Sequence, residues 1–170
     1  MPDIEKVCFD RILPYDLNRE LTPNGDDTRA ALPFRKRWPV GSTLRVRFME
    51  GTPAQQDEVK RFAPQWCDHA NLQFAFGNAP DAEIRITFRD DGAWSYMGTD
   101  CATIPRNEAT MNFGWLDEGV VLHEFGHALG LIHEHQNPVG GIKWNKPVVY
   151  QALGGSPNFW DTATIDHNMF

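Results

Sequence analysis

The chain has 170 residues, 41% of them hydrophobic, which is enough for one compact domain with a buried core and too few for two domains of ordinary size. Its formal net charge of −7 disfavours a nucleic-acid backbone or an anionic membrane surface as partner, because both attract basic patches. No apolar run reaches the length of a membrane span, and Met1–Lys6 lacks the basic and apolar regions of a signal peptide. We expect a soluble monomer of unknown compartment, and secretion stays open if a leader has been removed.

The N-terminal residues 1–37 predict an irregular extension. They contain several prolines and the turn-forming sequence N-G-D-D at residues 24–27. The chain has three cysteines, Cys8, Cys67 and Cys101, and an odd number leaves at least one thiol outside any internal pair. We therefore expect a fold that does not depend on disulfides.

Three segments have the apolar–polar alternation of half-buried strands, namely residues 44–48, 72–76 and 83–88. Between the first two, a helix is predicted from Pro53 to about Ala70, capped by Thr52 and weakened in its middle by Pro64. A further strand at residues 109–114 leads into a second helix that starts near Asp117, with acidic residues in its first turn. The pattern indicates an α+β domain.

One continuous segment, His123–Glu134 (H-E-F-G-H-A-L-G-L-I-H-E), has three histidines at a spacing that suits one metal ion. Residues four apart lie on the same face of a helix, so His123 and His127 can direct imidazole nitrogens at a single ion. Gly130 can adopt positive φ, end the helix and turn the chain so that His133 supplies a third ligand. Three imidazoles leave one coordination position open, as in catalytic rather than structural zinc sites.

Glu124 lies beside the first of these ligands and is predicted to be a general base. A carboxylate there can take a proton from a zinc-bound water and later deliver it to a leaving amine. H-E-x-x-H alone occurs by chance in unrelated helices, whereas the longer spacing through Gly130 and His133 is the metzincin signature. One catalytic Zn²⁺ is the expected cofactor, and a histidine-rich solvated helix is the alternative.

The segment from His123 through Pro138 resembles the astacin branch of the metzincin metallopeptidases, in which Glu134 is the branch marker. Residues 92–98, G-A-W-S-Y-M-G, are similar to the G-C-W-S-Y-x-G stretch of that family, which is an edge strand there. Residues 38–41, W-P-V-G, are similar to the entry into the family's first strand. The resemblance covers residues 38–138 and leaves both ends of the chain outside it.

The resemblance implies a twisted mixed sheet of about five strands, with a backing helix and an active-site helix. It divides the chain into the irregular extension 1–37, an N-terminal catalytic subdomain 38–134 that includes the zinc helix, and a partial C-terminal subdomain 135–170. The family's methionine turn has the form S-x-M-x-Y, which this chain lacks. Met169 is the only methionine after the zinc helix, and the C-terminal subdomain therefore looks truncated.

The resemblance also implies a zinc-dependent endopeptidase that hydrolyses extended protein or peptide substrates. The substrate would pair its backbone with the predicted edge strand, where Trp94, Ser95 and Tyr96 are candidate substrate-binding residues. The competing function is a catalytically weak or inactive peptide-binding module or fragment stabilised by zinc. A thermolysin-like site would instead take its third ligand from a distant glutamate, which His133 makes unnecessary.

Other residues allow two interpretations. Glu134 anchors the mature N-terminus in astacins and is a tentative second-shell residue here, with a surface carboxylate as the alternative. Cys8 or Asp10 could occupy the open zinc position and keep the site latent, or could be an ordinary buried thiol and a turn aspartate. Ala93 replaces the cysteine of a family disulfide, which is therefore expected to be absent. Three further histidines lack ligand spacing and are expected at the surface or in hydrogen bonds: His69, His135 and His167.

Overall fold

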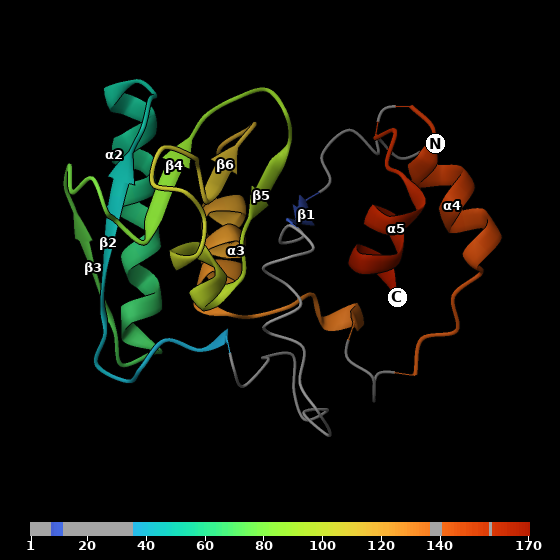
Figure 1. Ribbon diagram of the computed structural model, residues 1–170, viewed down its shortest axis with the longest axis horizontal. Coiled ribbons are helices and arrows are strands. Elements are labelled where there is room, and N and C mark those ends of the chain that lie inside the picture. Colours follow the sequence, from blue (N-terminus) through green and yellow to red (C-terminus); the bar gives the residue numbers. More distant parts are fainter. Residues whose placement is uncertain (1–7, 12–35, 137–140, 157) are drawn as a thin grey trace.

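The computed structural model describes residues 8–11, 36–136, 141–156 and 158–170, and Figure 1 shows their arrangement. Its sheet has the strands β1 (Cys8–Asp10), β2 (Thr43–Phe48), β3 (Gln73–Phe76), β4 (Ile84–Thr87), β5 (Ala93–Ser95) and β6 (Met111–Phe113). The strand order is β1-β5-β6-β4-β2-β3. Among these strands only the β5–β6 pair is antiparallel, so the sheet is mixed. The predicted α+β fold with a mixed sheet is confirmed.

The first helix is shorter than the sequence predicts. Helix α2 (Pro53–Phe62) begins with a capping box in which Thr52 and Gln55 satisfy each other's backbone N–H groups. Beyond Phe62 the chain tightens into the 3₁₀ helix η2 (Ala63–Asp68) instead of continuing as an α-helix to residue 70. Pro64 explains the change, because proline has no N–H to donate and its ring crowds the preceding turn.

The main hydrophobic core lies between the sheet and the two helices that cover one of its faces, α2 and α3 (Glu118–Leu129) (Figure 1). Helix α3 contributes three side chains that are 0% exposed, Val121, Phe125 and Ala128. The strands contribute alternating apolar positions, such as Ile84 and Ile86 in β4. Because the apolar side of α3 is locked into this core, the position of its opposite, histidine-bearing side is determined as well.

Two tryptophans attach helix α3 to the rest of the domain. The Nε1–H of Trp66 donates to the carbonyl of Leu122 (2.9 Å), and that of Trp38 donates to the carbonyl of Ala128 (2.8 Å). The Trp66 ring also explains Gly126, because a Cβ at this position would lie 3.3 Å from the ring. Asp117 is the N-cap, and its side chain accepts from the N–H of Val120 (2.9 Å), so the helix begins where the sequence predicts.

Arg85, on β4, is buried and ties the segment before β6 to the sheet. Its guanidinium donates to the carbonyls of Ala82, Ile104, Pro105 and Glu108, at 2.7 to 3.3 Å. Four carbonyl acceptors allow this cation to be buried without an ionised partner, although burial still lowers its pKa.

Strand β1 changes the predicted picture of the N-terminal extension. Residues 8–10 pair in parallel with residues 93–95 of β5, so this part of the extension is a strand of the sheet rather than irregular. As a result β5 is not the edge strand among the described residues. The sequence could not reveal this pairing, since a three-residue strand has no periodicity and its partner lies 85 residues away along the chain. The rest of the extension, apart from Arg11 and Lys36–Arg37, lies outside the described residues.

The C-terminal part contains the 3₁₀ turn η4 (Glu134–Gln136) and the helices α4 (Lys146–Gly154) and α5 (Thr162–Met169). In Figure 1 strand β1 lies between β5 and these two helices, and α5 contacts both β1 and η4. Met169 is the last residue of α5, so it is part of a helix and not of a methionine turn. Among the described residues no helix is long and apolar enough to cross a membrane.

Candidate metal centre

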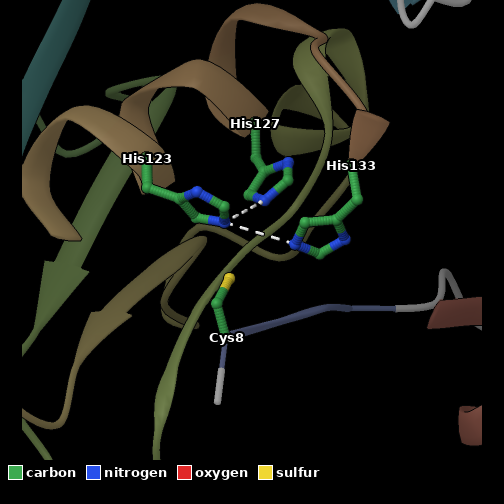
Figure 2. Close-up of side chains that lie close together, drawn as sticks. All are labelled: Cys8, His123, His127 and His133. Carbon is green, nitrogen blue, oxygen red and sulfur yellow. Dashed lines mark hydrogen bonds between the residues drawn. The ribbon is translucent and has the colours of Figure 1, made fainter. Parts of the chain in front are cut away.

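The end of helix α3 brings three histidine side chains together. The Nε2 atom of His123 lies 2.9 Å from Nε2 of His127 and 3.2 Å from Nε2 of His133, and the three rings converge on one point (Figure 2). His123 and His127 come from successive turns of the helix, while His133 follows the turn that ends it. The helical spacing and the turn therefore bring the three rings together.

Gly130 makes that turn. Its φ of 108° is in the left-handed region, which glycine adopts without the steric cost that a Cβ brings. The N–H of Gly130 donates to the carbonyl of His127 (2.8 Å), and the N–H of Leu131 donates to the carbonyl of Gly126 (3.0 Å). These two bonds form a Schellman motif, which reverses the chain within a few residues and presents His133 to the helix.

The same turn orients His127. Its Nδ1 lies 2.7 Å from the carbonyl oxygen of Leu131, and because a carbonyl only accepts, Nδ1 carries the proton. Nε2 is then the atom whose lone pair is available, and it faces the other two histidines. Burial lowers the pKa of His127, with an opposing contribution from the Leu131 carbonyl, so the neutral ring is favoured.

His123 is also held neutral. Its pKa is lowered to about 4, first by desolvation and second by the neighbouring imidazole of His127. Neutral imidazole is the form that binds metal, because a protonated Nε2 has no lone pair to donate.

The donor set fits a zinc ion. Four ligand atoms at the usual zinc distances of 2.0–2.1 Å lie about 3.3 Å apart when they are arranged tetrahedrally. The observed Nε2 separations of 2.9 and 3.2 Å are close to that value. Lone pairs that converge on one point at this separation are stabilised by a cation between them. Imidazole nitrogens are common ligands of zinc.

A fourth potential ligand atom comes from strand β1. The Sγ atom of Cys8 and one ring nitrogen from each histidine all lie within 4.8 Å of one another. Figure 2 shows the sulfur directed at the space between the rings. The four side chains together are therefore a candidate ligand set for one metal ion. The side chain of Asp10, the other predicted candidate for this position, lies outside the described residues.

Glu124 follows His123 on the helix and is 0% exposed. It lies about 100° around the helix axis from its neighbour.

The predicted substrate-binding residues are buried in this form of the chain. Trp94 is 4% exposed, Ser95 is 0% and Tyr96 is 8%, and the two aromatic rings pack edge to face at 6.2 Å in a second core cluster with Cys101 and Ile104. The backbone edge of β5 that faces away from β6 is paired with β1. Because the side chains are buried, a peptide could reach β5 only through this backbone edge, and only where β1 is displaced from it.

Two cavities border the histidines. One of about 540 Å³ lies between Trp66, the end of α3 and the His133–His135 segment. The other, of about 320 Å³, is lined by Cys8, Trp115, Asp117, Gly119, Val120 and His123. His123 and Gly119 line both cavities, so both border the histidine cluster.

The remaining candidates have other surroundings. Glu134 is exposed on η4. His135 lies with its Nε2 2.6 Å from the carbonyl of Asn168 and stacks on His133 with a centroid distance of 5.1 Å, so it is a hydrogen-bonded histidine that links η4 to α5. All three cysteines of the chain lie among the described residues, and none of them forms a disulfide.

The fold and the site together define a class. A mixed sheet, a helix with two histidines four residues apart, a glycine turn and a third histidine make a zinc domain of the metzincin type. Within that class the model of the Astacin peptidase family matches residues 32–139. The chain belongs to the astacin family, the resemblance seen in the motifs is confirmed, and zinc is the metal of this family.

Individual relatives agree. The structure titled "Structure of myroilysin" is 42% identical with a TM-score of 0.75, and the match covers 82% of this chain and 72% of that one. Zinc metalloproteinase nas-38 of Caenorhabditis elegans is 27% identical over 62% of this chain, and Tolloid-like protein 1 of Mus musculus is 26% identical over 74%. The matched part is only 14% of nas-38 and 12% of the mouse protein.

Proposed function

We propose that this chain is a zinc-dependent endopeptidase that hydrolyses peptide bonds in extended protein substrates. The observation that carries the proposal is the convergence of three imidazoles, with Nε2 of His123 2.9 and 3.2 Å from its two counterparts, beside the buried carboxylate of Glu124. In this proposal His123, His127 and His133 hold the ion. When bound, zinc supplies Lewis acidity that polarises a carbonyl and makes water a stronger acid.

The chain's own residues perform the proton transfers. Glu124 accepts a proton as the water oxygen bonds to the scissile carbonyl carbon, and it gives that proton to the nitrogen when the carbon–nitrogen bond breaks. The Leu131 carbonyl keeps His127 in the tautomer that presents Nε2. Glu134, exposed on η4, is proposed only as an outer residue of the site, without a role in proton transfer.

The test measures zinc and hydrolysis on the same preparation of the full chain. We expect about one zinc per chain and cleavage of a denatured protein substrate that a chelator abolishes and added zinc restores. Glu124→Gln should keep the zinc and reduce hydrolysis by about 10²- to 10⁴-fold, the usual contribution of a general base. Glu118→Gln, the same change at an exposed position of the same helix, is the matched control, with nearly unchanged activity expected. Hydrolysis that survives Glu124→Gln would refute the assigned base.

Cys8 supports a second proposal about the same site. A thiolate in the fourth position excludes water from it, so the form of the chain described here is latent, and displacement of β1 opens the site. The alternative function, a zinc-stabilised peptide-binding module, is favoured by the same observation, because structural zinc sites have four protein ligands.

Cys8→Ala separates these two possibilities. For a latent peptidase the variant keeps its zinc and hydrolyses faster than the parent chain, because the fourth position is open. For a structural site the variant binds zinc more weakly and shows no gain in hydrolysis. Zinc content and initial rate, measured together, therefore decide between them.

A further inference from the structure

On the face of the sheet opposite to Cys8, the side chain of Arg11 contacts Trp94 and Asp91 beside the edge of β5. Successive side chains of a strand alternate between the two faces, so a residue three positions after Cys8 points the other way. That residue is Arg11, whose N–H continues the pairing with β5 by donating to the carbonyl of Ser95 (3.3 Å). Its guanidinium carbon lies 3.8 Å from the ring centroid of Trp94, and its Nη2 lies 3.9 Å from Oδ2 of Asp91.

The carboxylate of Asp91 is held in place by buried groups. Its Oδ1 accepts from Nδ2 of Asn112 (2.6 Å) and from Nε1 of Trp94 (3.3 Å), and Asn112 is 0% exposed. Asn112 also donates to the carbonyl of Gly92 (2.6 Å). Because Oδ1 is taken up by these donors, Oδ2 is the oxygen that faces the guanidinium.

These contacts make a site for a cation. The aromatic face attracts positive charge, and the adjacent carboxylate supplies a counter-charge that is already oriented, so little ordering is needed when a cation arrives. The site is made by β5 and the loop before it and does not depend on β1. Arg11 occupies it here, with its side chain 38% exposed, so the occupant can exchange with solvent-borne groups.

We infer that Asp91 and Trp94 form a subsite for a basic side chain on the rim of the peptide-binding edge. Peptides with an arginine or lysine that reaches this subsite are then bound in preference to peptides without one. The inference deepens the proposed function and rests on it for the idea that peptides pair with β5. In the chain as described, Arg11 is the occupant that aligns β1 so that Cys8 faces the histidines.

The first test measures binding without turnover, so it does not depend on hydrolysis. The full zinc-loaded chain with Arg11→Ala and Glu124→Gln is titrated with a fluorescent extended peptide that has one arginine, and with the same peptide in which neutral citrulline replaces it. The arginine is moved along the peptide one position at a time. At the position that reaches the subsite we expect the arginine peptide to bind about three- to tenfold more tightly.

Asp91→Asn should abolish that preference. The amide oxygen can still accept from Asn112 and Trp94, so the variant removes the charge and keeps the hydrogen bonds. Asp90→Asn, the same change one residue away on an exposed side chain, is the matched control and should keep the preference. Equal binding of the two peptides at every position, or a preference that survives Asp91→Asn, would overturn the inference.

A second readout uses the chain's own arginine and holds even if no added peptide binds. Alkylation of Cys8 is followed by mass spectrometry, which separates it from Cys67 and Cys101. Arg11→Ala and Asp91→Asn should each increase the rate several-fold by loosening β1, whereas Arg11→Lys and Asp90→Asn should change it little. A rate that is the same in Arg11→Ala as in the parent chain would show that the subsite does not hold a basic side chain. Loss of hydrolysis alone would count against the proposed function and leave this inference standing.

Discussion

The segments that meet at the metal centre, helix α3 with its turn and strand β1, reach it by different routes. The first supplies three histidines within eleven consecutive residues, and its apolar side is packed in the main core, where Val121, Phe125 and Ala128 are 0% exposed. Strand β1 supplies one thiol from the other end of the chain through a three-residue ladder and the half-exposed Arg11. The difference teaches that the histidines are anchored by the main core, whereas Cys8 is held near them by few contacts, as the proposed reversible closure requires.

The largest expected effect is on zinc affinity, when a candidate histidine ligand or the candidate cysteine ligand is removed. His127→Ala should weaken zinc binding by at least about a hundredfold, because even loss of an outer-shell partner costs 10- to 100-fold. Cys8→Ala should weaken it far less if β1 is a reversible cover. Competition with a metal chelator of known affinity measures both. Similar losses for the two variants would break the comparison and make Cys8 an equal, permanent ligand.

The next largest effect is expected on the alkylation rates of the three cysteines with and without zinc. We expect zinc to slow alkylation of Cys8 by about tenfold or more, since a coordinated thiolate is not free to react. Cys67, which is half-buried away from the ligand group, should react at the same rate with and without zinc. Cys101 should stay unlabelled in the folded chain, because burial raises its pKa to about 12. Zinc-independent labelling of Cys8 would place it outside the metal site.

A change in the turn tests the rigid side of the comparison. Gly130→Ala puts a Cβ at a φ of 108° and should lower the free energy of unfolding by about 1–2 kcal/mol. It should also weaken zinc binding, because the turn both presents His133 and orients His127. Gly41→Ala is the matched control, since Gly41 has a φ of 83° with open space around it and lies away from the site. Its unfolding should show a similar loss with unchanged zinc affinity. Denaturant titration and metal competition separate the two effects.

The smallest effect concerns helix caps. Asp117→Ala removes the N-cap of α3, and Asp161→Ala removes that of α5, whose side chain accepts from the N–H of Thr164 (2.7 Å). Each should cost about 1 kcal/mol of stability. If α3 supports the histidines and α5 does not, only Asp117→Ala should also reduce zinc affinity. A zinc effect from Asp161→Ala would show that the C-terminal helices help to hold the metal centre.

Much of the fold follows from local patterns. Residues 44–48, 72–76 and 83–88 alternate in polarity and become β2, β3 and β4, because the period of a half-buried strand is visible in any window of five residues. The start of α3 at Asp117 and its end at Gly130 were predictable from capping chemistry, which depends on a few neighbouring residues. The spacing of His123, His127 and His133 is likewise a local pattern, within eleven residues.

Only the tertiary structure shows the contacts between residues that are far apart in the sequence. Nothing in C-F-D marks Cys8–Asp10 as a strand, and its pairing with β5 exists because that edge has backbone groups to satisfy. The same holds for the anchoring of α3 by Trp38 and Trp66, and for the orientation of Asp91 by Asn112, each of which joins residues more than 20 positions apart. The sequence by itself determined which histidines are spaced to share one metal ion, because spacing on a helix and its turn is local. Only the packed structure decided what closes the site and what faces the peptide edge, because those contacts depend on how distant segments share one surface.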